Sequence, residues 1–175
     1  MLKLLGAAVV MLSCAGMLSE WRKNYKSRIC ELKQLCRLYR SAKNAMEEER
    51  IHMPDFVRRY RERECQKETA EGEMLKCLEV FLNERCYSTG EEAWKQAYLR
   101  TERWWHLTWE ERELLKQSGD AFFGRNLAEN MQRLLLYEQR MQDFLKNVEQ
   151  EYREKNRVWT PVGMLLGVML VVILL

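Results

Sequence analysis

The chain has 175 residues, of which 29 are Lys or Arg and 26 are Asp or Glu. All of these charges except Lys3 lie between Glu20 and Arg157, with both signs interspersed. A dedicated nucleic-acid-binding protein would instead carry a basic face or stripe. The chain has only two prolines and eight glycines, and its middle is rich in the helix formers Glu, Arg, Leu, Lys and Gln. We therefore expect an all-α fold without a nucleic-acid partner.

Residues 1–19 form an apolar run that is interrupted only by Lys3. Because the run leads without a loop into a helical pattern, we predict a retained transmembrane helix. Two alternatives stay open, a cleaved signal peptide and a lipoprotein cleavage box around Ser13 and Cys14. Cleavage would make the protein a secreted or lipidated helical binding protein.

A long amphipathic helix is predicted to follow this run. Its apolar residues fit a heptad seam made of Ile29, Leu32, Cys36, Tyr39 and Met46, and Leu35 and Ala42 widen this stripe. The helix should end near Arg50, because Pro54 disfavours helical backbone at Met53.

Four arginines crowd the short helix that is predicted to come next. Phe56, Val57 and Tyr60 give this helix its apolar face, and the other face carries Arg58, Arg59, Arg61 and Arg63. The arginines could bind phosphates of lipid or nucleic acid, or they could form a solvated face paired with Glu62, Glu64 and other acids. The sequence favours the solvated face. A further helical stripe follows at Met74, Leu75, Leu78, Phe81 and Leu82.

Capping signals predict where the later helices begin. Overlapping capping boxes pair Ser88 with Glu91 and Thr89 with Glu92, and a third pairs Thr108 with Glu111. Gly119 should end the helix after Thr108 as a left-handed cap. Four tryptophans between Trp94 and Trp109 predict the densest part of the core, with Trp94 and Trp105 inside it.

The last helix should begin at Leu127 and continue into a second apolar segment. Its apolar positions are spaced by alternating steps of four and three, interrupted by Glu138, and they are Leu127, Met131, Leu134, Met141, Leu145, Val148 and Tyr152. Val158 to Leu175 contains no ionisable side chain. These residues span roughly 27 Å as a helix, close to the ~30 Å core of a bilayer. Gly163 and Gly167 form a G-x-x-x-G pattern that lets membrane helices approach closely.

The two apolar segments divide the chain into transmembrane helices 1–19 and 158–175 around a helical bundle domain, 20–157. Basic residues flank both segments on the inner side, so the positive-inside rule predicts a cytoplasmic domain on a two-span membrane protein. The long first and last helices should pair antiparallel and carry the shorter helices at their far end.

Sites for chemistry are not evident in the sequence. His52 and His106 belong to no motif, and nucleotide-binding and hydrolase signatures are missing. The six cysteines show no zinc-site spacing, and we expect them to be free thiols. We therefore predict a protein that is not an enzyme and has no cofactor, metal or small-molecule substrate.

The two ends and the architecture together resemble the stage III sporulation protein AB family. The similarity lies in the opening residues Met1 to Ala7, the tail from Gly163, and Gly119 and Gly124, which are similar to an L-G-x-x-L-G signature. The resemblance implies a membrane component of the channel-like complex between mother cell and forespore. Its soluble domain would be similar to the cytoplasmic domains of F-type inner-membrane proteins of type II secretion systems.

That resemblance also implies partners, namely a cytoplasmic ATPase and other membrane proteins of the complex. Our hypothesis is that Arg58, Arg59, Arg61 and Arg63 help to dock this ATPase, since arginine suits bidentate contact with carboxylates. The sequence leaves open whether the protein forms homo-oligomers. The alternative is a generic membrane-tethered coiled-coil scaffold unrelated to sporulation.

Overall fold

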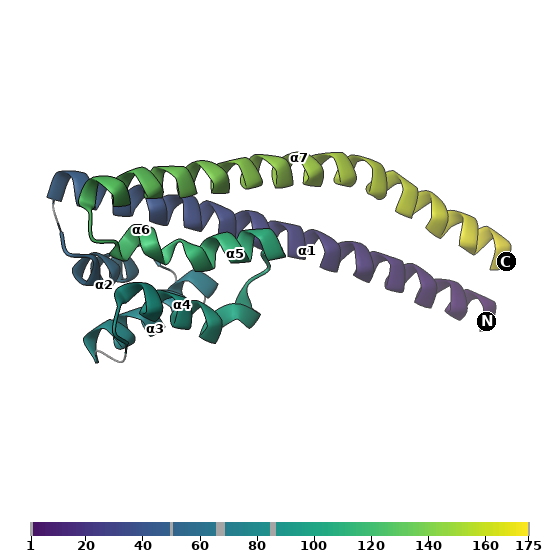
Figure 1. The fold of residues 1–175 in the computed structure, drawn as a ribbon. Coiled ribbons are helices and arrows are strands. Elements are labelled where there is room, and N and C mark those ends of the chain that lie inside the picture. The colour runs from purple at the N-terminus through teal and green to yellow at the C-terminus, as the bar shows by residue number, and fades with distance from the viewer. Residues whose placement is uncertain (1, 50, 66–68, 85–86, 175) are drawn as a thin grey trace. The chain divides into compact units, whose positions relative to one another are not determined.

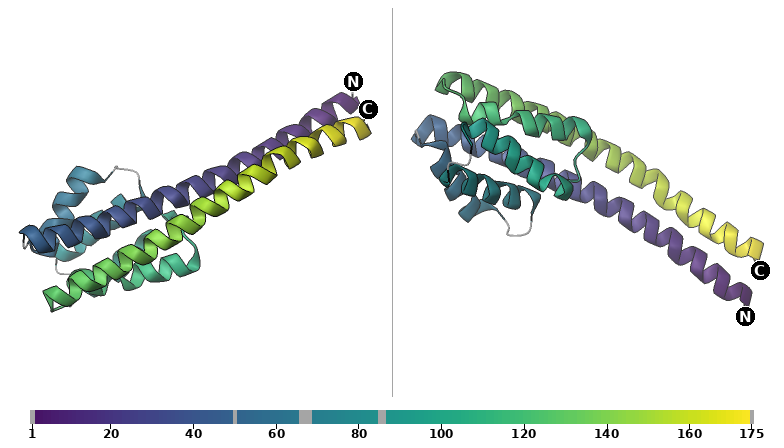
Figure 2. Two further views of the ribbon diagram at one scale, coloured as in Figure 1. Left: turned by 90° about the horizontal axis from the view of Figure 1, so that it is seen from above. Right: turned by 60° about the horizontal axis from the view of Figure 1, so that its bottom comes forward.

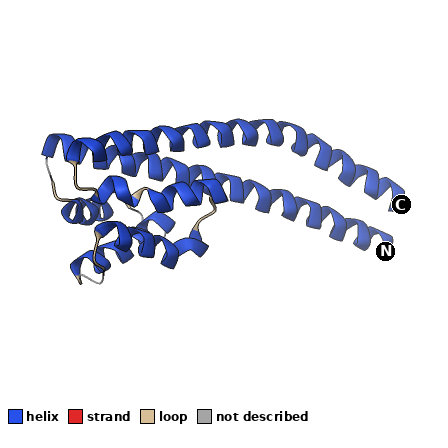
Figure 3. Cartoon of the chain, viewed as in Figure 1, coloured by secondary structure: helices blue, strands red, loops and turns tan. Residues whose placement is uncertain are grey.

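The structure is a computed structural model that describes residues 2–49, 51–65, 69–84 and 87–174. These ranges are helical and contain no strand, which confirms the predicted all-α fold (Figures 1 and 3). The elements follow in the order α1 (Leu2–Asn44), a π-helical turn (Ala45–Glu49), α2 (Met53–Glu64), α3 (Ala70–Asn83), α4 (Gly90–Thr101), a 3-10 turn (Glu102–Trp104), α5 (Trp109–Gln117), α6 (Gly119–Phe123) and α7 (Leu127–Leu174). The first helix and the π turn that continues it end at Glu49. This agrees with the predicted end near Arg50, which rests on the effect of Pro54 on the backbone before it.

The chain divides into two compact units, residues 1–29 with 146–175 and residues 30–145. In the first unit the start of α1 and the end of α7 lie side by side and run antiparallel (Figure 2). Trp21 stacks on Tyr152 with ring centroids 6.0 Å apart. The Tyr25 hydroxyl donates to Glu151 Oε1 at 2.9 Å and accepts from Lys155 Nζ at 3.0 Å. Aromatic and polar contacts thus join the two helices here.

Within the described part of the chain, no helix combines the length and the apolarity that crossing a membrane requires. The predicted transmembrane helices 1–19 and 158–175 are therefore not supported by the structure, although both segments are helical. The surroundings of Gly163 and Gly167 lie outside the described part, so their predicted role in membrane-helix packing stays a prediction.

The second unit buries a wide stripe of α1. Tyr39 illustrates why, because its ring contacts both Phe122 of α6 and Tyr137 of α7, and its hydroxyl donates to Ser118 Oγ at 3.0 Å. A helix that packs against several neighbours buries more than the two positions per heptad of a coiled coil. The predicted seam is buried from Leu32 onward, and the structure adds residues outside it. The added residues are Leu38 and Ala45, and Leu35 and Ala42, which were predicted to widen the stripe, are buried as expected.

Glu138 interrupts the apolar stripe of α7 for a structural reason. Leu134 and Met141 on either side are fully buried, and Glu138 is buried with them. Its Oε1 accepts from Arg40 Nε at 2.8 Å, so an ion pair to α1 occupies the position where a leucine would otherwise pack. Leu127, predicted to belong to the same stripe, is 48% exposed. It is the first residue of α7 and precedes the buried part of the helix.

The tryptophans between positions 94 and 109 do not form one core cluster. Trp94 and Trp105 are buried as predicted, but Trp104 is 44% and Trp109 is 77% exposed. Trp104 lies in the 3-10 turn and Trp109 is the first residue of α5, and neither position faces the interior. Trp94 stacks on Phe122 at 4.5 Å and donates from Nε1 to the Leu115 carbonyl at 2.9 Å.

Two of the predicted caps are confirmed. Thr89 Oγ1 accepts from the Glu92 amide at 3.2 Å, and Glu111 Oε2 accepts from the Thr108 amide at 2.8 Å. The third box is wrong, because the Ser88 hydroxyl donates to the Glu92 carboxylate instead of pairing with Glu91.

The prediction that Gly119 is a left-handed cap is wrong, because Gly119 is the first residue of α6. A Cβ at this position would lie 2.9 Å from the Cβ, Cγ and Cδ1 atoms of Trp94. Such a contact is closer than packed side chains tolerate, so close packing on Trp94, rather than backbone conformation, requires glycine here.

Candidate partner-binding site

Helix α2 presents its apolar side to the interior and its arginines away from it. Pro54 lies in its first turn, where the missing amide costs no hydrogen bond. The buried residues are Met53, Phe56, Val57 and Tyr60. These residues pack α2 on the rest of the second unit, and the remaining positions carry the four arginines singled out in the sequence.

The structure divides the four arginines into two pairs. Arg58 Nη2 lies 3.2 Å from Asp55 Oδ1 on the same helix. Arg61 Nε lies 2.7 Å from Glu79 Oε2 of α3, and this side chain is half-buried. These two guanidinium groups are thus engaged with acids of the domain itself, as the solvated-face interpretation expects.

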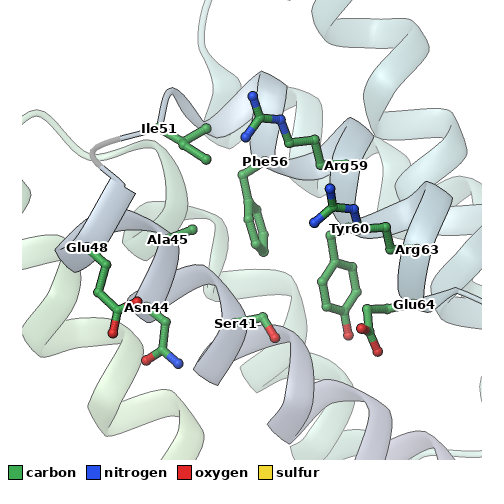
Figure 4. A pocket seen from close by; sticks show the side chains of 10 residues that line it. All are labelled: Ser41, Asn44, Ala45, Glu48, Ile51, Phe56, Arg59, Tyr60, Arg63 and Glu64. Carbon is green, nitrogen blue, oxygen red and sulfur yellow. The ribbon is translucent and has the colours of Figure 1, made fainter.

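Arg59 and Arg63 are exposed and lie one helical turn apart along a common cavity (Figure 4). The cavity has a volume of about 240 Å³ and lies between the end of α1, the π turn and α2. Its other lining residues are Ser41, Asn44, Ala45, Glu48, Ile51, Phe56, Tyr60 and Glu64. The sequence could not separate this pair of arginines from the other two, because the separation depends on how α2 packs against α1 and α3.

The cavity combines charged groups with an aromatic surface. The side chains of Phe56 and Tyr60 extend from α2 into it, and the guanidinium groups of Arg59 and Arg63 lie above them (Figure 4). Glu48 enters from the side of the π turn. The arrangement offers donors to an anionic group and apolar surface to a neighbouring side chain.

The ring of Tyr60 is held in place by a hydrogen bond to the buried carboxyl group of Glu71. The Tyr60 hydroxyl donates to Glu71 Oε1 at 3.2 Å, and Glu71 is only 3% exposed. Burial raises the pKa of Glu71 to about 7, although the Tyr60 hydrogen bond and the charge of Arg37 oppose the rise. Burial also raises the pKa of the Cys65 thiol to about 12, so that this thiol is not reactive at neutral pH.

A second buried acid fixes the loop before α5. Glu31 Oε2 accepts from the His106 amide at 2.8 Å, and Glu31 Oε1 lies 2.6 Å from His106 Nδ1. Burial raises the pKa of Glu31, and the contacts with His106 partly offset this effect. Arg112 donates to the carbonyls of Trp105 and Leu107. This network attaches residues 105–108 to α1, and no sequence motif announced it.

Within the described ranges, no three His, Cys, Asp or Glu side chains are grouped so as to hold a metal ion. The thiols of Cys30, Cys36, Cys65 and Cys77 are free, which confirms the prediction for these four. Cys86 and the side chain of Cys14 lie outside what the structure describes.

Comparisons with known proteins agree with the resemblance seen in the sequence. The model of the family described as stage III sporulation protein AB matches residues 3–175. A solved structure titled "Stage III sporulation protein AB (SpoIIIAB)" is similar with a TM-score of 0.64 and 16% identity, covering 73% of this chain and 97% of that chain. At this identity the structural likeness shows the fold alone, and no curated protein matches the chain. The family match gives the chain a role in sporulation rather than that of a generic scaffold. The chain belongs to the stage III sporulation protein AB family.

Proposed function

We propose that this chain is a non-enzymatic structural component of a membrane-bound, secretion-like sporulation complex and that its helical domain docks the complex's cytoplasmic ATPase. Family membership supports the role in sporulation. The observation that carries the docking proposal is the pair Arg59 and Arg63, which are exposed, one turn apart and aligned along one cavity (Figure 4).

Arginine pairs of this kind suit recognition of a protein carboxylate. A guanidinium group offers a planar fork of donors that matches a carboxylate, and hydrogen bonds between charged groups are about twice as strong as neutral ones. Arg58 and Arg61 are engaged with Asp55 and Glu79. We assign docking to Arg59 and Arg63 because these two exposed side chains line one cavity, whereas Arg58 and Arg61 do not line it.

The proposal includes two membrane anchors, residues 1–19 and 158–175, with domain 20–157 in the cytoplasm. Its support is the sequence, in which Val158 to Leu175 carries no ionisable side chain and basic residues flank both segments. Gly163 and Gly167 would let the second anchor pack closely on another membrane helix, such as that of a second copy. A cysteine placed near Gly90 should resist an impermeant thiol reagent in intact cells. Labelling there without lysis would contradict the cytoplasmic location.

The docking proposal is tested by reversing charges on α2 in the full chain. Arg59→Glu with Arg63→Glu should reduce recovery of the ATPase with the tagged protein and block sporulation. Arg58→Glu is the control, because it reverses one arginine of the same helix that does not line the cavity. Circular dichroism and melting should be unchanged in both variants, since these side chains are exposed. Full recovery of the ATPase with the double variant would refute the proposal, and the surface around Trp109 to Lys116 would become the next candidate.

A further inference from the structure

The basic excess of the chain lies beside its two apolar segments. The stretches 20–28 and 151–157 together hold seven Lys or Arg and three Glu. The residues between them, 29–150, hold 21 Lys or Arg and 23 Asp or Glu and are therefore nearly neutral. The positive charge of the protein is thus concentrated where the two long helices meet the apolar segments.

Four of the cations in these stretches have exposed side chains. Glu20 and Glu154 are exposed as well, so the exposed charge is reduced but stays positive. Glu151 is half-buried and contacts its neighbours instead, because it accepts from the Tyr25 hydroxyl at 2.9 Å and from Lys155 Nζ at 2.5 Å. We call the four exposed cations the basic collar, and they are Lys23 and Lys26 of α1 and Arg153 and Arg157 of α7.

Three aromatic rings join the two helices at the level of the basic collar. The ring centroids of Trp21 and Tyr25 are 4.9 Å apart, and those of Tyr25 and Tyr152 are 6.1 Å apart. All of these residues belong to the first compact unit, in which α1 and α7 lie side by side (Figure 2). Trp and Tyr are the aromatic residues that favour the boundary between membrane and water. Cations of both helices thus accompany one aromatic contact of interfacial type.

The position of the basic collar along the helices matches the headgroup layer of a bilayer. Each of its residues lies at most seven positions from the predicted segments 1–19 and 158–175, or within roughly 11 Å along a helix. The headgroups occupy roughly 5–8 Å on each side of the hydrocarbon core, and long Lys and Arg side chains can reach back toward them. The attraction of an anionic surface extends over about 8 Å of solution at physiological salt.

We infer that the basic collar binds the phosphate groups of anionic phospholipids at the membrane surface. This inference rests on the proposed function, because the two membrane anchors bring the collar to the bilayer. It adds that the helix pair next to the anchors selects lipids by charge. A zwitterionic headgroup places a cation beside the same phosphate, so the collar should prefer lipids with a net negative charge.

The inference is tested by titrating the detergent-solubilised full chain with phosphatidylglycerol or with phosphatidylcholine and counting bound lipid by native mass spectrometry. Phosphatidylglycerol should bind at least about tenfold more tightly at low salt, because each cation near the headgroups adds attraction. Physiological salt should reduce this preference by screening. A variant with Lys23→Gln, Lys26→Gln, Arg153→Gln and Arg157→Gln should bind the two lipids within about twofold of each other.

The matched control removes four exposed cations from the second unit instead. It carries Gln at four positions and loses the same charge as the collar variant, so it should keep the preference for phosphatidylglycerol. Circular dichroism verifies the folding of both variants. The control substitutions are Lys95→Gln, Arg103→Gln, Arg125→Gln and Arg140→Gln.

The outcomes separate this inference from the proposed membrane anchors. Equal binding of both lipids by the wild type, or a collar variant that keeps the preference, would overturn the inference. Equal loss in the control variant would overturn it too, because net charge and not the collar would then select the lipid. The anchors are tested on vesicles of phosphatidylcholine alone. Release of the chain from these vesicles by alkaline carbonate would refute the anchors, whereas the lipid preference would still support the collar.

Discussion

Replacing Glu71 with glutamine should stabilise the protein at alkaline pH and have little effect in acid. Glu71 is almost completely buried, and the hydrogen bond from Tyr60 and the charge of Arg37 do not offset the loss of hydration, so its pKa is raised to about 7. Glutamine has the shape of the protonated acid and can still accept the hydrogen bond from Tyr60. The substitution therefore removes the charge and keeps the contact.

The direction of the pH dependence follows from proton binding. The pKa of Glu71 rises from 4.5 to about 7 on folding, so the folded protein binds more protons than the unfolded chain between these values. Stability must then fall as the pH rises through this range. At about 1.36 kcal/mol per pKa unit, the ionised carboxylate costs about 3 kcal/mol once the pH exceeds the folded pKa. Below the unfolded pKa the cost vanishes.

Thermal unfolding of the full chain at pH 5 and pH 8 measures this effect. Glu71→Gln should raise the Tm at pH 8 by roughly 6–12 °C, at roughly 2–4 °C per kcal/mol for a protein of this size, and by much less at pH 5. Glu64→Gln is the matched control, because Glu64 lines the nearby cavity but is exposed. A Glu71→Gln variant that is less stable than wild type at pH 8, or equally shifted at both pH values, would refute the reasoning.

Three further substitutions test the packing of the helices. Trp94→Ala should lower the free energy of unfolding by about 3–5 kcal/mol, whereas Trp109→Ala, at a 77% exposed position, should change it by less than about 0.5 kcal/mol; equal losses in denaturant titrations would show that the two environments are misassigned. Gly119→Ala should cost about 1–3 kcal/mol, because its Cβ would meet the Cβ of Trp94 at 2.9 Å, and a variant that melts like wild type would contradict this contact. Glu138→Leu should leave the melting temperature unchanged or raise it, since Arg40, at 62% exposure, is not left buried without a partner; a marked loss would show that the ion pair itself stabilises the fold.

Local patterns in the sequence predicted local features of the fold. Thr89 and Thr108 begin helices as expected, because a cap depends on residues only three positions apart. The burial of Leu32 and Leu134 followed from helical periodicity in the same way. The interruption at Glu138 was visible too, but its partner Arg40 is 98 positions away, and no local pattern could identify it.

Features that depend on packing between distant helices could not be predicted. Gly119 has the position of a helix cap in the sequence, yet the closeness of Trp94 decides its role. The grouping of Arg59 with Arg63, apart from Arg61, depends on Glu79 of α3 and on the cavity beside α1. The sequence drew attention to α2, and the structure shows which two of its arginines line the cavity.

The most direct test of the docking proposal is the affinity of the purified ATPase for the full chain at low and at physiological salt. With Arg59→Glu and Arg63→Glu the Kd should rise at least about tenfold, or about 1.4 kcal/mol, and most of the wild-type salt dependence should disappear, because salt screens exposed charges beyond about 8 Å at physiological ionic strength. Arg58→Glu should bind within about twofold of wild type. Equal affinity of the double variant and wild type at both salt concentrations would contradict docking through this site.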